Sequence, residues 1–193
     1  MIPLAGYLED DLRWTQPLAG VRSYLLEAES ATLATLRFEC PGAALASGQT
    51  AHQIWRFSHT GFLKPTATIK IKGHQAILAL YRATWTLANG ELTLYDGTQY
   101  RFRPTNLWGT RHAFETCRGE VLLRYRSGHT FGKLSERFEA TVTATEVGRE
   151  SRDVELLIVA GWYFLTADRG SAALVALLDE TVPAVTRPAD CRG

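Results

Sequence analysis

The longest unbroken apolar run of the chain is residues 154–167, VELLIVAGWYFLTA, near the C-terminal end. A membrane span needs about 20 apolar residues, and a single strand rarely reaches even the length of this run, so a buried helix fits it best. Ser151 or Asp153 can cap its start, and the charged residues after Ala167 indicate its end, which predicts a helix over about 153–167. A helix that is apolar all round must be covered on every side. The rest of the chain therefore has to enclose it.

Most of the preceding sequence alternates with the period of a β-strand. In residues 64–72, KPTATIKIK, Lys70 and Lys72 share one face with two threonines, while Ile69 and Ile71 share the other. This pattern is typical of a strand that is wet on one side and buried on the other.

Turn signals separate the expected strands. Asn89-Gly90, Asp96-Gly97 and Arg118-Gly119 are each predicted to form a tight hairpin turn, because glycine and asparagine tolerate positive φ angles. Strands are expected at about 21–28, 31–38, 50–58, 64–72, 84–87, 91–95, 98–103, 111–117, 120–126 and 136–145, with 41–49 as a loop or a short covering piece. About ten short strands at regular spacing favour an antiparallel sandwich or barrel over parallel β-α-β units.

The helix and the strands have matching dimensions. At about 1.5 Å per residue, the apolar run forms a rod of about 21 Å, which is comparable to the height of a small barrel. We therefore expect residues 1–193 to form one all-β domain: a closed antiparallel β-barrel, with strands over about 20–146, around a C-terminal apolar helix. The tail, residues 171–193, is expected to lie outside the barrel.

This order of elements resembles a known superfamily. The segments NLWGTRHAFE (106–115), EVLLRYR (120–126) and ELLIVAGWYFL (155–165) follow one another as in the tubby C-terminal domain, the LURP-one-related proteins and the phospholipid scramblases. The resemblance covers roughly residues 20–167 and implies a single antiparallel barrel threaded by a helix. It also implies binding of phosphoinositide headgroups by clustered lysine and arginine, or action at a membrane. No cysteine-rich cluster, proline-rich leader or acidic calcium loop of the scramblase kind is present in the sequence.

Charge divides unevenly along the chain. Residues 41–126 hold eleven basic and four acidic residues, whereas residues 1–40 and 127–193 both carry a net negative charge. Such asymmetry favours a face for anions, although the acidic ends could also fold over the middle and cancel it.

Six basic residues form the candidate anion-binding site. Each pair alternates with apolar residues along one expected strand and so shares the outer face: Lys70 with Lys72, Arg101 with Arg103, and Arg124 with Arg126. If these strands are neighbours, the pairs form a cluster that suits phosphate, because arginine offers a planar fork of donors. A solvated exterior is the plainer interpretation of the same residues.

No enzymatic or metal-binding motif is apparent in the sequence. The segment 127–134, SGHTFGKL, lacks the spacing of a phosphate loop and favours a hairpin loop instead. His112 and Cys117 lie an odd step apart on one expected strand, as do His52 and His59, so neither pair shares a face. We expect no catalytic residues, no metal and no cofactor.

Cysteine and tryptophan usage adds two expectations. Three widely spaced cysteines, Cys40, Cys117 and Cys191, give neither a disulfide framework nor a zinc site and favour a reducing compartment. The N-terminus has no apolar signal-peptide region, so we expect a cytoplasmic protein, with peripheral membrane contact as an option. Among the tryptophans, Trp55, Trp85 and Trp162 are expected in the core.

Trp108, in the turn TNLWGT, is expected to be partly exposed. It could serve as an interfacial anchor, although contact with the barrel rim is the plainer interpretation.

The sequence favours a non-enzymatic binding or scaffold protein. Its expected partner is an anionic lipid headgroup or a phosphorylated small molecule; nucleic acid is not favoured, because the pI of 7.8 is low and aromatic and basic residues do not interleave. The alternative is a lipocalin-like carrier, in which the barrel holds a small apolar ligand and residues 155–165 pack outside.

Overall fold

The computed structural model describes the backbone of residues 1–39, 44–61, 64–128 and 138–180, and the side chains of these residues except 128 and 168–180. The short helices are η1 (Leu4–Tyr7) and α1 (Glu146–Arg149), and the long helix is α2 (Val154–Glu180). The strands are β1 (Leu12–Thr15), β2 (Ser23–Ala28), β3 (Ala31–Phe38), β4 (Ala46–Thr50), β5 (Ile54–Thr60), β6 (Thr66–Ile71), β7 (Ile77–Ala83), β8 (Gly90–Leu94), β9 (Gln99–Pro104), β10 (Arg111–Thr116), β11 (Val121–Gly128) and β12 (Glu139–Ala144).

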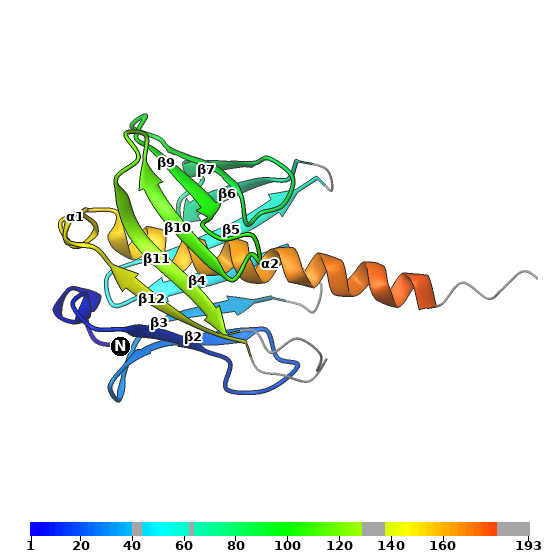
Figure 1. The fold of residues 1–193 in the computed structure, drawn as a ribbon, viewed down its shortest axis with the longest axis horizontal. Helices are drawn as coiled ribbons and strands as arrows, with labels where there is room; N and C mark the ends of the chain where they lie inside the picture. The colour runs from blue at the N-terminus through cyan, green and yellow to red at the C-terminus, as the bar shows by residue number, and fades with distance from the viewer. Residues whose placement is uncertain (40–43, 62–63, 129–137, 181–193) are drawn as a thin grey trace, which may run out of the picture.

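The strands form one closed antiparallel barrel, which confirms the expected fold class (Figure 1). Each strand pairs with the next one along the chain, and β1 pairs with β12 to close the ring, with Trp14 opposite Ala140. Closure leaves no unpaired strand edge.

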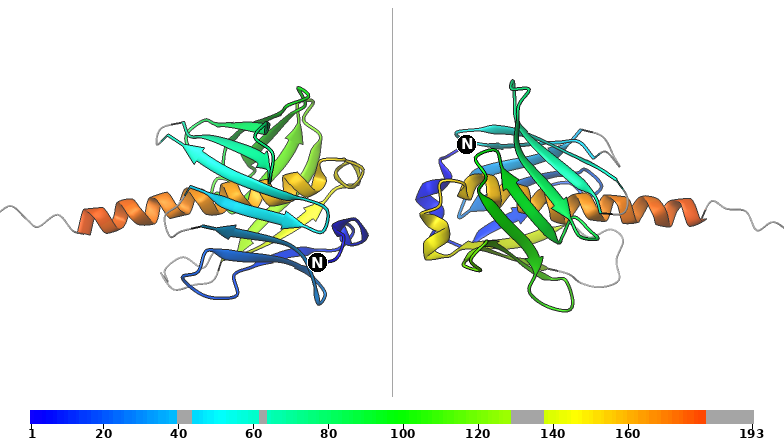
Figure 2. Two further views of the ribbon diagram at one scale, coloured as in Figure 1. Left: turned by 180° about the vertical axis from the view of Figure 1, so that it is seen from behind. Right: turned by 90° about the horizontal axis from the view of Figure 1, so that it is seen from above.

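The N-terminal half of α2 fills the barrel. All residues from Leu156 to Ala167 are buried, and Figures 1 and 2 show the helix running lengthwise between the strands. Three consecutive aromatic side chains each stack on a ring from a different strand: Trp162 on Trp14 of β1 (5.7 Å between ring centroids), Tyr163 on Phe57 of β5 (4.9 Å) and Phe164 on Tyr81 of β7 (3.8 Å). The interior that the carrier alternative needs is therefore occupied by the chain's own helix.

The helix is longer than the sequence pattern predicts. It continues through residues 168–170 to Glu180 and projects from the barrel as a free-standing rod (Figure 1). Aspartate and arginine are compatible with a helix, and one glycine inside a helix costs only about 1 kcal/mol, so this tripeptide does not end it. Residues 181–193 of the expected tail lie outside the described residues.

Several expected elements are wrong in place or number. The expected ten strands are twelve, because β1 precedes residue 20 and β4 occupies most of the segment expected to be a loop. Residues 84–87 form a loop between β7 and β8 rather than a strand, so Asn89-Gly90 is not a two-residue hairpin turn. Trp85 lies in that loop and is 75% exposed instead of buried. The turns at Asp96-Gly97 and Arg118-Gly119 are present, with φ of 86° at both glycines.

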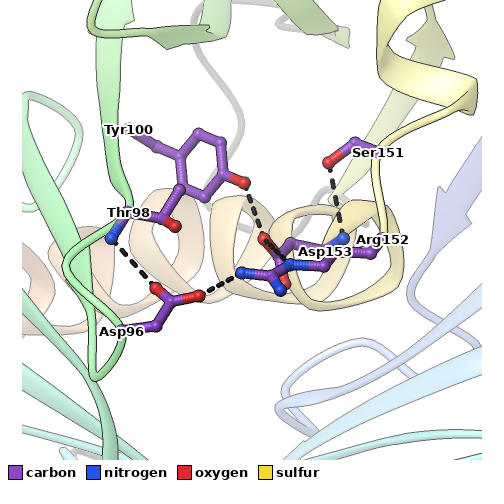
Figure 3. A network of polar contacts seen from close by, with 6 residues as sticks. All are labelled: Asp96, Thr98, Tyr100, Ser151, Arg152 and Asp153. Carbon is purple, nitrogen blue, oxygen red and sulfur yellow. Dashed lines mark hydrogen bonds and ion pairs between the residues drawn. The ribbon is translucent and has the colours of Figure 1, made fainter.

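Polar contacts fix the start of α2 to the β8–β9 hairpin (Figure 3). Tyr100 donates a hydrogen bond of 2.6 Å to the carboxylate of Asp153, and Arg152 forms an ion pair with Asp96. Asp96 also accepts the backbone N–H of Thr98 at 2.9 Å, which lowers the pKa of its carboxyl group. The residue before the helix and the hairpin tip are thus held together.

The two ends of the barrel differ in what they carry. The hairpins β4–β5, β8–β9 and β10–β11 lie where α2 starts, and we call this the start end. The loops 16–22, 84–89 and 105–110 lie at the opposite end, where α2 leaves the barrel, and we call this the exit end (Figures 1 and 2).

Candidate anion-binding site

Four of the six predicted basic residues lie on one part of the barrel wall. Arg101 and Arg103 project outward from β9, and Arg124 and Arg126 project outward from β11, while the aromatic residues between them face the core. β10 lies between these two strands, so the pairs are about 10 Å apart across the sheet.

The register adds a residue that the sequence did not single out. Arg111 of β10 lies directly opposite Arg126 of β11, and Ala113 lies between Arg103 and Arg124. We define the arginine face as Arg103, Arg111, Arg124 and Arg126. Period-two alternation would place Arg111 outward, but its proximity to Arg126 follows only from the strand pairing.

Carboxylates neutralise two of the predicted arginines. Arg103 donates two hydrogen bonds of 2.8 Å to Glu115 of β10, and this pairing raises the pKa of Arg103. The Glu115 side chain is only 6% exposed, so it lies beneath the guanidinium that covers it. Arg101 pairs with Glu91 of β8 at 3.4 Å. Both partners come from the basic middle of the chain rather than from its acidic ends.

Three arginines of the face keep their full charge. Within the described ranges, no carboxylate lies within 4.0 Å of Arg111, Arg124 or Arg126. All three side chains are exposed. Like charges directly opposite each other on neighbouring strands destabilise a sheet, and Arg111 and Arg126 are such a pair. A bound anion would remove this repulsion.

Lys70 and Lys72 belong to a different part of the wall. Lys70 lies on β6, which β7 and β8 separate from β9, and Lys72 follows directly after β6. Across the sheet, Lys70 is opposite Arg56 of β5, whose guanidinium pairs with Glu39 at 3.0 Å. The six predicted residues therefore do not form a single cluster.

The histidines have local roles. His52 forms an ion pair of 2.9 Å with Glu155 in the first turn of α2, where Glu155 also accepts a hydrogen bond of 2.7 Å from Thr50. His59 contacts the hydroxyl group of Tyr163 at 2.8 Å. Buried His112 stacks on Phe102 with ring centroids 5.4 Å apart.

Other reactive side chains do not assemble into a site. Cys117 is exposed while His112 is buried, as their opposite faces predict. Across the described part of the chain, no three histidine, cysteine, aspartate or glutamate side chains gather as a metal ion would require. Cys40, Cys191, His129 and most of the segment 127–134 lie outside the described residues.

Comparisons with protein-family models, with curated proteins and with solved structures found no match for this chain. None of the helices in the described part of the chain combines the length and the hydropathy that a membrane crossing requires.

Proposed function

We propose that this protein is a non-enzymatic binding protein that recognises a phosphate-bearing anion through the arginine face. The ligand is an anionic lipid headgroup or a phosphorylated small molecule, which offer the same phosphate oxygens. We also propose membership of the tubby-like superfamily, since a helix-filled antiparallel barrel is the architecture that the sequence resemblance implies.

The opposed pair Arg111 and Arg126 carries the proposal. Both are exposed, both lack a carboxylate within 4.0 Å among the described residues, and Arg124 projects from the same strand as Arg126. A guanidinium donates two parallel hydrogen bonds to phosphate oxygens, and three of them around one phosphate supply more donors than a single carboxylate ligand can accept.

Glu115 makes this face more selective. It neutralises Arg103 and leaves the uncompensated charge on β10 and β11, toward the exit end. A charge concentrated on two adjacent strands favours a compact polyanion over an extended one such as nucleic acid.

The test is a calorimetric titration with pyrophosphate and with inositol trisphosphate. The double variant Arg124→Gln/Arg126→Gln should weaken binding by about tenfold or more, because each lost charge-assisted contact contributes more than a neutral hydrogen bond. Its unfolding midpoint should not fall, since the substitution also relieves the repulsion with Arg111.

The matched control is Lys70→Gln/Arg82→Gln, which removes the same charge from β6 and β7. It should change the affinity by less than about twofold through the general field alone. Absence of binding by the unmodified protein, or equal losses in both double variants, would overturn the proposal.

The carrier alternative is weaker because a ligand in the barrel would have to displace α2. Trp162, Tyr163 and Phe164 occupy the interior, and each stacks on the wall.

A further inference from the structure

Exposed apolar side chains collect at the tips of three exit-end loops. They are Leu18 (64% exposed) and Val21 (48%) in loop 16–22, Trp85 (75%) in loop 84–89, and Leu107 (102%) and Trp108 (80%) in loop 105–110. We call these five residues the apolar rim. Single exposed apolar residues are common on proteins, but five from three loops that surround one end are not scattered at random.

The same three loops contain no aspartate or glutamate, and their one charged residue is Arg22. Glu39, Glu91 and Glu139 lie near the exit-end termini of their strands, and each forms an ion pair with an arginine. The start end is the opposite: Glu9, Asp10 and Asp11 precede β1, and Glu146, Glu150 and Asp153 follow β12. The barrel is thus polarised along its axis.

The arginine face adjoins the rim. Loop 105–110, which carries Leu107 and Trp108, connects β9 to β10, so Arg103 precedes it and Arg111 follows it directly. Arg126 pairs with Arg111 and therefore lies at the same height on the wall. Apolar tips and uncompensated guanidinium groups thus stand next to each other.

The helix emerges inside this ring of loops. α2 leaves the barrel through the exit end (Figure 2), and the sequence of its projecting part includes the apolar stretch SAALVALL, residues 171–178. A surface that carries tryptophan tips, lacks acidic loops and borders on arginines matches the chemistry of a membrane interface.

We infer that the exit end docks on the surface of an anionic lipid bilayer. The rim loops enter the interfacial layer, and the arginine face contacts headgroup phosphates. This inference rests on the proposed function for the arginine face, and it commits the ligand to a lipid source. A bilayer fits better than a protein partner, because separate loop tips around a projecting helix offer no continuous flat patch for a protein interface.

Fluorescence of the full-length protein with phosphatidylcholine vesicles, with and without phosphatidylserine, tests the inference. Brominated acyl chains quench tryptophans that enter the bilayer. Trp14 and Trp162 are buried, so quenching should arise from Trp85 and Trp108, and it should disappear in the variant Trp85→Phe/Trp108→Phe. Binding should be several-fold stronger to the anionic vesicles.

The triple variant Trp85→Ser/Leu107→Ser/Trp108→Ser should lower vesicle binding by at least about tenfold, because interfacial affinity scales with the apolar area inserted. The matched control Tyr95→Ser/Val147→Ser removes two apolar side chains that are 78% and 47% exposed at the start end, and it should bind vesicles as the unmodified protein does. Loss of binding in the control, no effect of the rim variant, or no quenching would overturn the inference.

Titration with soluble inositol trisphosphate separates the two proposals. A rim variant that keeps the soluble ligand and loses vesicles supports both. Binding of the soluble ligand without any vesicle binding leaves the proposed function standing and overturns the inference. Vesicle binding that depends on the rim but not on Arg124 and Arg126 supports docking and overturns the proposed role of the arginine face.

Discussion

Tyr125 of β11 and Gly161 of α2 meet inside the barrel so closely that Gly161 has no room for a side chain. A Cβ atom built on Gly161 would lie 2.5 Å from both the hydroxyl oxygen and the ring carbon that bears it. The Tyr125 hydroxyl group donates to the backbone carbonyl oxygens of Leu157 and Ile158, at 2.9 and 3.1 Å. Burial raises the pKa of this hydroxyl group well above its ordinary value. The contact fixes the height of the helix in the barrel.

Gly161→Ala should therefore destabilise the protein, although alanine is the better helix former. The gain in helix propensity is about 1 kcal/mol, whereas overpacking a dense core costs about 1–3 kcal/mol. We expect a net loss of about 1 kcal/mol in the free energy of unfolding, measured in urea. Gly6→Ala is the matched control, since no atom lies within 4 Å of the added Cβ, and it should change stability little. A Gly161 variant as stable as the control would show that the helix can shift.

Tyr100 gives stability a dependence on alkaline pH. Burial, and then the hydrogen bond to Asp153, raise the pKa of Tyr100 to about 12 from its ordinary 10.0. Because the folded state holds this proton more tightly, the contribution is complete below about pH 10 and disappears as the pH rises toward 12. The stability advantage of the unmodified protein over Tyr100→Phe should therefore shrink across this window. Urea unfolding of both proteins at several alkaline pH values measures it, and an advantage that stays constant would contradict the assignment.

His59 gives a dependence of the opposite sign. The Tyr163 hydroxyl group donates to the backbone oxygen of Ala44 at 2.5 Å, so it accepts a hydrogen bond from Nδ1 of His59. Burial, and then the charge of Arg22, lower the pKa of His59 below its ordinary 6.5.

The neutral form of His59 is therefore favoured in the folded state. Its contribution is complete above about pH 6.5 and is lost as the pH falls through the folded pKa. NMR titration of the imidazole should give a pKa below 6.5, and the unmodified protein should lose stability relative to His59→Gln as the pH falls from neutral to mildly acidic. A pKa at or above the ordinary value would show that solvent reaches this position.

Much of the fold could be predicted because it follows from local periodicity. The alternation in β6, β9 and β11 assigns their buried and exposed faces correctly, and the apolar run identifies the buried part of α2. The short strand β4 was missed because its residues, ASGQT, are small or polar. Gly48 faces Val159 of the helix, and its added Cβ would lie 2.4 Å from a methyl carbon. The strand is small where the helix needs space, which no local pattern reveals.

The candidate site could be predicted only in part. The sequence places Arg101, Arg103, Arg124 and Arg126 on outer faces, but strand order and register decide which charges meet. The pairing of Arg111 with Arg126 depends on the register of β10 and β11, and a shift by one residue would turn one of them inward. Trp85 was misassigned because a short alternating loop cannot be distinguished from a strand without its neighbours.

Glu115→Gln should strengthen anion binding while it weakens the fold. The buried carboxylate of Glu115 holds Arg103 by two hydrogen bonds of 2.8 Å, so its removal leaves Arg103 charged and free to bind a ligand. The affinity for pyrophosphate should rise by roughly two- to fivefold, the range expected for one exposed charge interaction. The thermal unfolding midpoint should fall, because a buried amide replaces the carboxylate partner of the guanidinium.

The matched control for this change is Glu39→Gln, which frees Arg56 on the opposite part of the wall and alters the net charge equally. It should leave the pyrophosphate affinity nearly unchanged. If both variants bind pyrophosphate more tightly by the same factor, the anion responds to net charge alone, and Arg103 is not part of its binding site. A larger gain for Glu115→Gln would place Arg103 beside Arg111, Arg124 and Arg126 as a fourth donor to the anion.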